Sequence, residues 1–212
     1  MVNIVWGVFI IIGIVFGTLT GKIGLINISK NYISTLKANE VYDSTLNWTK
    51  EFDEDFNNIL NKYKEYSIDV LNIEREQKKP RKDFAMYSEV KNSIWYMYDE
   101  YFENFKNEYD WQNIKDINLI KEIVSDYFNN YYDENDDKDT WFNKMKDLSE
   151  KYGFAGDMKA YKENPDNFKG NITDIATIIR VSITKCSNTP DLYEILRLLG
   201  LDRIKNRINL IK

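Results

Sequence analysis

Apolar and aromatic side chains recur at steps of three and four residues along most of this 212-residue chain. The longest such run is Phe56, Ile59, Leu60, Tyr63, Tyr66, Val70 and Ile73. This spacing places the side chains on one face of an α-helix. Gly and Pro, the residues that most often interrupt helices, number only nine and three, and no segment has the alternation of a convincing strand. The sequence predicts an all-α fold.

The spacing and the capping residues predict several helices. In the first half of the chain, helices are expected at 26–36, from Asn39 to Phe52, at about 53–73, and from Ser88 to Phe105, the last rich in aromatic residues. Further helices are expected at 117–132, from Asp139 or Thr140 to a left-handed cap at Gly153, and from a cap at Thr173 to Lys185. The next is expected to begin with a cap at Thr189 followed by Pro190 and to end at Gly200, and the last contains Ile204, Ile208 and Ile211. Pro80 stops regular structure and predicts a division into 23–80 and 81–212.

The first 22 residues form a separate hydrophobic segment. Met1–Gly21 contains no charged side chain, and about 20 apolar residues suffice for a helix to cross a bilayer. Lys22 and Lys30 follow, which favours a cytoplasmic location for the remainder. Three interpretations stay open: a membrane anchor through residues 2–20, a buried or partner-covered helix, or a foreign segment joined by gene rearrangement. Residues 1–22 also resemble the first helix of spore maturation proteins of the A type.

The residue types argue against a catalytic or metal site. The chain has no His, its one Cys is Cys186, and it contains no Gly-rich phosphate loop. An acidic segment, Asp133–Asp139, has Lys138 and Lys144 where a calcium loop needs Gly and Glu. We therefore interpret it as a solvated loop that caps the next helix, and we predict no catalytic residue, metal ligand or cofactor.

Positive charge is concentrated near the C-terminus. The net charge is -5, yet residues 159–212 hold ten Lys/Arg and six Asp/Glu, a local balance of +4. A basic face can bind phosphate even on an acidic protein. The candidate contacts, some beside Pro80 and the others C-terminal, are Lys79, Arg81, Lys82, Arg180, Lys185, Arg203, Lys205 and Arg207. A solvated linker is the alternative for the group beside Pro80.

Two sequence motifs resemble those of a known family: Tyr161–Pro165 (Tyr-Lys-Glu-Asn-Pro) and Asn188–Ile195 (Asn-Thr-Pro-Asp-Leu-Tyr-Glu-Ile). Further matching segments in the same order are Leu71–Glu76, Lys79–Asp83, Asp136–Phe142, Tyr152–Ala155, Lys169–Asn171 and Ile179–Val181. Together they resemble the C-terminal stem-contact and anticodon-binding region of clostridial-type glutamyl-tRNA synthetases, over about residues 25–212.

The resemblance implies a helical stem-contact region at 23–80, an anticodon-binding domain at 81–212, and tRNA, above all glutamate tRNA, as the partner. ATP and magnesium belong to the family's catalytic domain, whose signatures these 212 residues lack, so this chain alone is expected to be inactive. Many relatives have Thr-Gly-Arg where Thr184, Lys185 and Cys186 stand here. Gly suits a helix end with positive φ, and Arg could meet RNA. We therefore expect a weak anticodon preference.

Two functions remain open. The first is a tRNA-binding module of a glutamate--tRNA ligase without its catalytic domain, from a truncated or fused gene. The second is a membrane-anchored helical interaction protein with no RNA-binding role. The expected location is cytoplasmic, with tethering to the inner face of the plasma membrane if residues 2–20 insert, and no obligate protein partner is evident. We further expect Arg203, Lys205 and Arg207 to be replaceable without unfolding, because Ile204 and Ile208 hold the opposite face of their helix.

Overall fold

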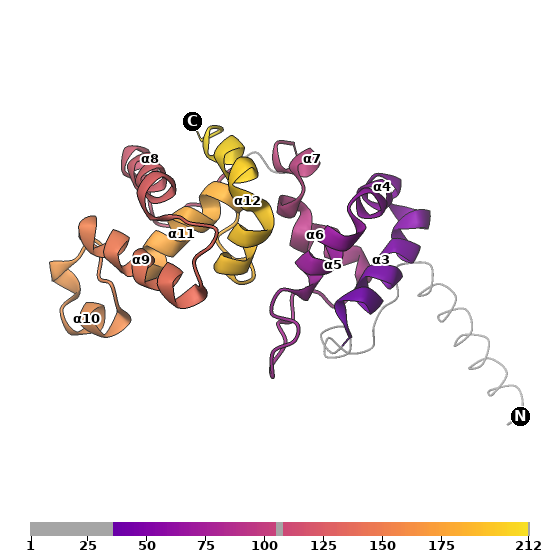
Figure 1. The fold of residues 1–212 in the computed structure, drawn as a ribbon, viewed down its shortest axis with the longest axis horizontal. Helices are drawn as coiled ribbons and strands as arrows, with labels where there is room; N and C mark the ends of the chain where they lie inside the picture. The colour runs from indigo at the N-terminus through magenta and orange to yellow at the C-terminus, as the bar shows by residue number, and fades with distance from the viewer. Residues whose placement is uncertain (1–35, 105–107, 212) are drawn as a thin grey trace, which may run out of the picture. The chain divides into compact units, whose positions relative to one another are not determined.

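The computed structural model describes residues 36–104 and 108–211. These ranges form helices joined by irregular loops (Figure 1), with an isolated β-bridge between Ala155 and Asn171 and no strand within them. The all-α prediction is confirmed. The hydrophobic segment 1–22, one interpretation of which is a membrane anchor, lies outside the described residues. Nearly all of the expected helix at 26–36 lies outside them as well. Within the described ranges, no helix is long and apolar enough to cross a membrane.

The chain divides into two compact units between Ile94 and Trp95. The described part of the first unit contains α3 (Ala38–Phe52), α4 (Glu54–Lys62), α5 (Lys64–Asn72), the short 3₁₀ turn η1 (Tyr87–Glu89) and α6 (Val90–Ile94). Helix α3 packs against α4, α5 and η1. The Tyr42 hydroxyl donates a 3.0 Å hydrogen bond to the Leu60 carbonyl, which ties α3 to α4. The division expected at Pro80 stays a prediction.

The helix expected over about 53–73 is interrupted. Tyr63, with φ -121° and ψ 45°, ends α4 and precedes α5. Its N–H still bonds the Ile59 carbonyl, and its own carbonyl accepts from Ser67 N–H. Apolar residues keep the three- and four-residue spacing on both sides of the break. Hydrophobic periodicity therefore could not reveal it.

The long aromatic helix predicted from Ser88 to Phe105 is wrong. The segment is divided into η1, α6, the 3₁₀ turn η2 (Trp95–Met97) and α7 (Asp99–Phe102), with Tyr98 extended at φ -112° and ψ 128°. The four consecutive residues Trp95–Tyr98 are all buried. Successive side chains of a regular α-helix point about 100° apart, so one helix face cannot bury such a run. Tight turns and an extended residue bury it instead.

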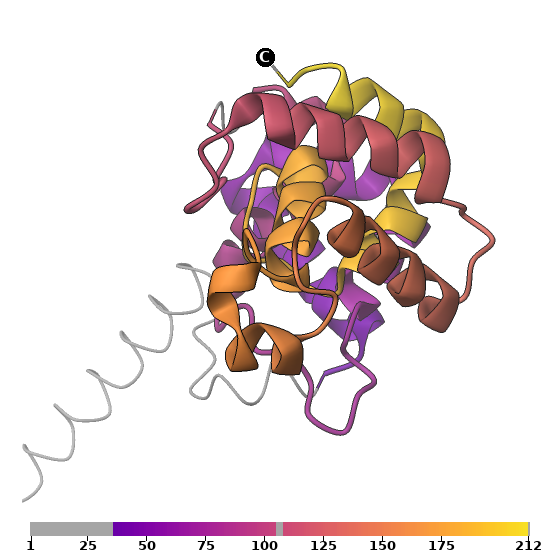
Figure 2. The same cartoon turned by 90° about the vertical axis from the view of Figure 1, so that its left-hand side faces the viewer.

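The second unit is built around α11 (Ile172–Thr184). Besides η2 and α7, the unit contains α8 (Ile117–Asp126) with a π-helical extension η3 (Tyr127–Tyr131), α9 (Lys138–Lys151), α10 (Met158–Glu163), the turn η4 (Pro165–Asn167) and α12 (Leu192–Ile208). Helix α11 packs against α8, α9 and α12 (Figure 2). Ile175, Ile178 and Ile179 are fully buried at this centre, because α11 is covered on several sides.

Capping residues define the ends of these helices. Gly153 has φ +79°, as predicted for the cap that follows α9. Asp137 caps the start of α9 by accepting from Thr140 N–H at 2.8 Å, which confirms the capping role of the acidic loop. The caps expected at Thr173 and Thr189 are wrong, because Asn171 caps α11 and Asp191 caps α12. Both have side-chain oxygens that reach backbone N–H groups of the first turn.

Gly200 bends α12. Its φ of 71° and ψ of 161° are not helical, so α12 is two helices joined at a kink. The helix end expected at Gly200 is thus found, and a short segment containing Ile204 follows. The last turns of α12, after this bend, run beside α8 (Figure 2), and residues of both helices line one groove.

Candidate nucleic-acid interface

The predicted cations beside Pro80 lie on an irregular loop of the first unit. Lys79 and Lys82 are exposed. Arg81 is half-buried and forms ion pairs with Asp83 and, at 3.9 Å, with Glu74. The loop therefore presents two exposed ammonium groups and one guanidinium that neighbouring carboxylates already neutralise.

Arg207 is not a surface residue. It is 2% exposed, and its guanidinium donates to the carbonyls of Tyr96 at 2.6 Å and Ile183 at 2.7 Å and to the carboxylate of Asp99 at 2.7 Å. These bonds join α12 to α11 and to the start of the second unit. Arg207 therefore does not lie on the exposed helix face on which the expectation of replacement without unfolding rested. Its surroundings come from distant parts of the chain, which a helical pattern cannot show.

Lys185 is buried as well, at 4% exposed. Its ammonium donates to the carbonyl of Phe102 and lies 4.6 Å from the centre of that ring. Burial lowers the pKa of Lys185, although Glu103 acts in the opposite direction. Neither Lys185 nor Arg207 has surface to offer a phosphate in this conformation, so RNA contact by these two residues would require the unit to open.

The backbone at Lys185 is left-handed, with φ 59° and ψ 6°, and it caps the end of α11. A Gly at this place would suit a helix end with positive φ, and the structure shows that the helix end keeps this conformation with Lys185 in it. A non-glycine residue pays a steric cost in this region. The Lys185 side chain also makes a hydrogen bond and a cation–π contact with Phe102, which act in the stabilising direction.

Arg203 and Arg180 hold intermediate positions. Arg203 Nε lies 3.2 Å from Asp99 Oδ2, so Asp99 binds both Arg203 and Arg207. Arg180 donates to the carbonyl of Ser187 at 3.3 Å. The Ser187 hydroxyl in turn donates to Asp110 at 2.6 Å, and this network holds the loop between α11 and α12. Arg180 thus holds a loop and Arg203 binds α7, while each arginine keeps part of its surface in solvent.

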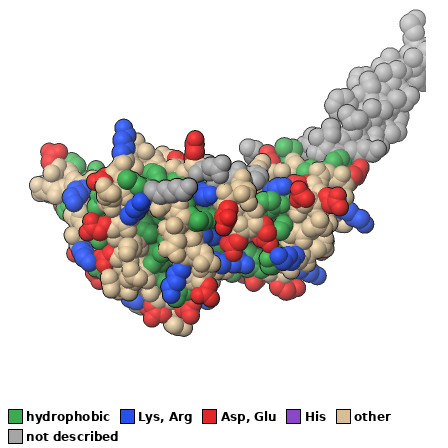
Figure 3. All heavy atoms as spheres, turned by 90° about the horizontal axis from the view of Figure 1, so that it is seen from above, with side chains coloured by type: hydrophobic (Ala, Val, Ile, Leu, Met, Phe, Trp, Pro, Cys, Tyr) green, Lys and Arg blue, Asp and Glu red, His purple; other side chains and the backbone are tan. Residues whose placement is uncertain are grey.

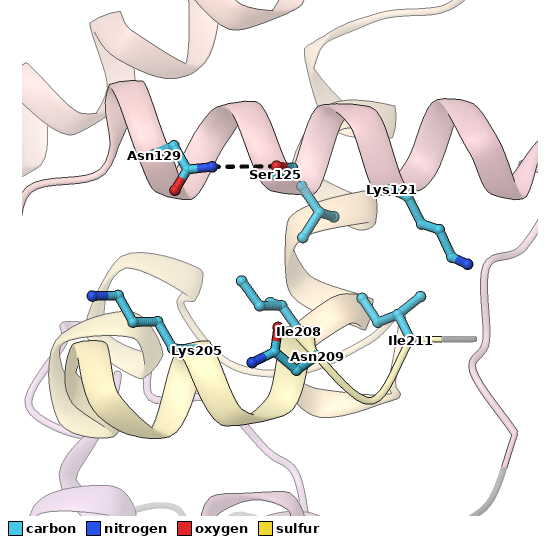
Figure 4. Close-up of a pocket in the computed structure, with 8 residues that line it drawn as sticks. Lys121, Ser125, Asn129, Lys205, Ile208, Asn209 and Ile211 are labelled. Carbon is cyan, nitrogen blue, oxygen red and sulfur yellow. Dashed lines mark hydrogen bonds between the residues drawn. The ribbon is translucent and has the colours of Figure 1, made fainter.

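Lys205 is exposed and lies in a groove between α8 and the end of α12 (Figure 4). The groove has a volume of about 520 Å³, within the usual range of ligand sites. It is lined by Lys121, Val124, Ser125, Asn129, Lys205, Ile208, Asn209 and Ile211. Two cations and no acid line it. Sequence reasoning missed Lys121, because this lysine lies outside the basic C-terminal stretch and only packing brings it to Lys205.

The wider surface is mixed in charge. On the face drawn in Figure 3, Lys and Arg side chains are interspersed with Asp and Glu among the residues that the structure describes. Several lysines are paired, including Lys138 with Asp191 at 2.5 Å and Lys144 with Asp136 at 2.6 Å. Within the described residues, no group of His, Cys, Asp and Glu side chains is arranged to hold a metal ion. For the binding of an anion, the local charge of a feature such as the groove therefore matters more than the net charge of the chain.

No family model matches the chain. The glutamate--tRNA ligase of Clostridium perfringens strain 13 is 36% identical over 193 residues, which is 91% of this chain and 35% of that protein. The ligase of Acetivibrio thermocellus is 36% identical over 86% of this chain, and that of Clostridium beijerinckii is 31% identical over 91%. The chain spans about one third of the length of these relatives. It is a homologue of a partial region of clostridial-type glutamate--tRNA ligases.

Proposed function

We propose that this chain binds tRNA, with glutamate tRNA as its natural partner, as a helical module related to the anticodon-binding part of glutamate--tRNA ligases. The supporting observation is the extent of the match, 91% of this chain against 35% of a relative named for that activity. An all-α fold without a nucleotide-binding loop suits RNA binding better than chemistry. The motifs shared with the family's C-terminal region support the same assignment.

The exposed cations are the groups that would contact the RNA. Lys79, Lys82 and Lys205 are exposed, while Arg203 is partly exposed at 29% of its side chain. Contacts to phosphate supply most sequence-independent affinity and release counterions. Lys185 and Arg207 stabilise the scaffold and are left out of this contact set.

Discrimination between anticodons is expected to be weak. The position where relatives have Gly is Lys185, whose side chain is held inside the second unit. The next residue, where relatives have Arg, is the half-buried Cys186, which has no charge to offer a base edge. An Arg guanidinium can stack on an unstacked base and hydrogen-bond its edge, and a Cys side chain cannot do both. The module would therefore bind tRNA mainly through contacts with the phosphate backbone of the RNA.

A titration of labelled glutamate tRNA at 50 and 200 mM salt tests this proposal. Binding should weaken with salt at a slope of roughly -0.7 to -0.9 per phosphate neutralised. Replacing Lys79, Lys82 and Lys205 with Ala should make the salt dependence shallower, with a slope less negative by about 1 for each lysine that contacts a phosphate. A matched control removes three other exposed lysines, Lys50, Lys64 and Lys115. No binding at low salt, or equal losses in both triple variants, would contradict the proposal.

A further inference from the structure

We propose that the groove between α8 and the end of α12 holds a short stretch of single-stranded RNA, with one phosphate at Lys121 and another at Lys205. This inference rests on the proposed tRNA binding and adds a location and a conformation for the RNA. It assigns a role to Lys121, which the sequence patterns did not single out.

The two lysines lie at opposite ends of the groove. Figure 4 shows Lys205 on the side of Asn129 and Lys121 on the side of Ile211, with Ile208 between the helices. Lys121 and Asn129 are eight positions apart. At the α-helical rise of 1.5 Å per residue, the part from Lys121 to Asp126 alone advances roughly 7–8 Å, and the π-helical segment η3, which contains Asn129, extends this distance. Cations separated in this way suit two phosphates of one strand better than a single phosphate.

The electrostatics of the groove favour an anion. Its lining contains no carboxylate. Asp126, on the same helix as Lys121, is instead bonded to Lys151 at 2.7 Å, and this hydrogen bond lowers the pKa of Asp126. Its negative charge is thus compensated by a residue that does not line the groove. Lys121 and Lys205 are left as the charged groups of the lining.

The walls between the lysines match the remainder of a nucleotide. Ile208 and Ile211, above the buried Val124, provide apolar surface against which a base or ribose can pack. Ser125, Asn129 and Asn209 provide hydroxyl and amide groups, and Asn129 donates to Ser125 at 3.2 Å. Proteins contact bases in this manner when the bases are unstacked, because a duplex buries their faces. The apolar floor therefore points to a loop or a single strand, and the amides favour RNA over an acidic peptide.

The test compares two RNA probes, a tRNA-derived anticodon stem-loop and a blunt duplex of the same length, by fluorescence anisotropy with the full chain. The variant replaces Lys121 and Lys205 with Gln, and the control replaces the exposed Lys115 and Lys162 with Gln. For the stem-loop, we expect the salt slope to become less negative by about 2 in the variant and to change less in the control. The salt slope for the duplex should change equally in the variant and in the control.

A second variant, Ile208→Ser, tests the apolar floor without changing charge. It should weaken binding of the stem-loop, leave the duplex unaffected and keep the salt slope, and thermal unfolding checks that the fold is retained. If the wild-type chain binds neither RNA at low salt, the proposed function itself fails. If it binds but the Lys121/Lys205 variant behaves like its control, only the groove assignment fails. Equal losses for stem-loop and duplex, or equally tight binding of a poly-glutamate peptide at these lysines, would also overturn it.

Discussion

Lys185 and Arg207 lie against the same aromatic ring. Lys185 Nζ is 4.6 Å and Arg207 Cζ 4.2 Å from the centre of Phe102. Two buried cations repel each other, so the arrangement needs compensating acceptors. The carbonyls of Phe102 and Ile183 and the carboxylate of Asp99 are among these acceptors. This cluster, Lys185, Arg207, Phe102 and Asp99, joins α7, α11 and α12 within the second unit.

Arg207→Ala is expected to destabilise the second unit by at least about 2 kcal/mol, because it removes charge-assisted hydrogen bonds and leaves buried carbonyls without donors. Lys205→Ala, two positions earlier and exposed, should change the free energy of unfolding by less than about 0.5 kcal/mol. Urea denaturation of both variants measures the difference. Equal small effects would show that the buried bonds of Arg207 contribute little.

Substitutions at Lys185 should separate backbone strain from side-chain contacts. Lys185→Gly and Lys185→Ala both remove the hydrogen bond to Phe102, but only Gly relieves the left-handed φ of 59°. The Gly variant should therefore be more stable than the Ala variant by about 1 kcal/mol. Thermal unfolding of the two proteins provides the comparison. An Ala variant as stable as the Gly variant would argue that this helix end relaxes out of the left-handed region.

Gly200→Ala is expected to cost about 1–3 kcal/mol, since a φ of 71° with a ψ of 161° is nearly restricted to Gly. A Cβ at this position would meet no atom within 4 Å, so the cost arises from the backbone alone. Asn206→Ala, at an exposed position of the same helix, is the control. Chemical denaturation measures both. A neutral Gly200→Ala variant would mean that α12 can straighten.

The pair Asp126–Lys151 should give a pH-dependent contribution to stability. The hydrogen bond from Lys151 lowers the pKa of Asp126, and the same bond raises the pKa of Lys151. The contribution of Asp126 is complete above its unfolded pKa near 3.9 and is lost as the pH falls through its folded pKa. That of Lys151 is complete below its unfolded pKa near 10.4 and is lost as the pH rises through its folded pKa.

Asp126→Asn should therefore be less stable than the wild-type chain between about pH 4 and pH 10, and the difference should vanish at more acidic pH. Unfolding curves at closely spaced pH values, with Asp139→Asn as an exposed control, measure this profile. A difference that persists unchanged at about pH 2, where the carboxylate is protonated, would attribute the effect of the substitution to packing instead of charge.

Local patterns predicted several features that the structure confirms. The positive φ of Gly153, the capping of α9 by the acidic segment Asp133–Asp139 and the change of direction at Gly200 all depend on a few neighbouring residues. The break at Tyr63 and the turns at Trp95–Tyr98 were not predictable in this way. At Trp95–Tyr98 four consecutive side chains are buried, which one helical face does not allow, and at Tyr63 the apolar spacing continues across the break and so hides it.

The sequence by itself determined the helical class, most helix positions and the relationship to glutamate--tRNA ligases, because periodicity, caps and ordered motifs are properties of neighbouring residues. Only the tertiary structure decided what each cation does. Periodicity shows which residues share a helix face, but not what that face meets. Arg207 is buried because acceptors from Tyr96, Asp99 and Ile183 converge on it. Lys121 and Lys205 share a groove because α8 packs beside the end of α12.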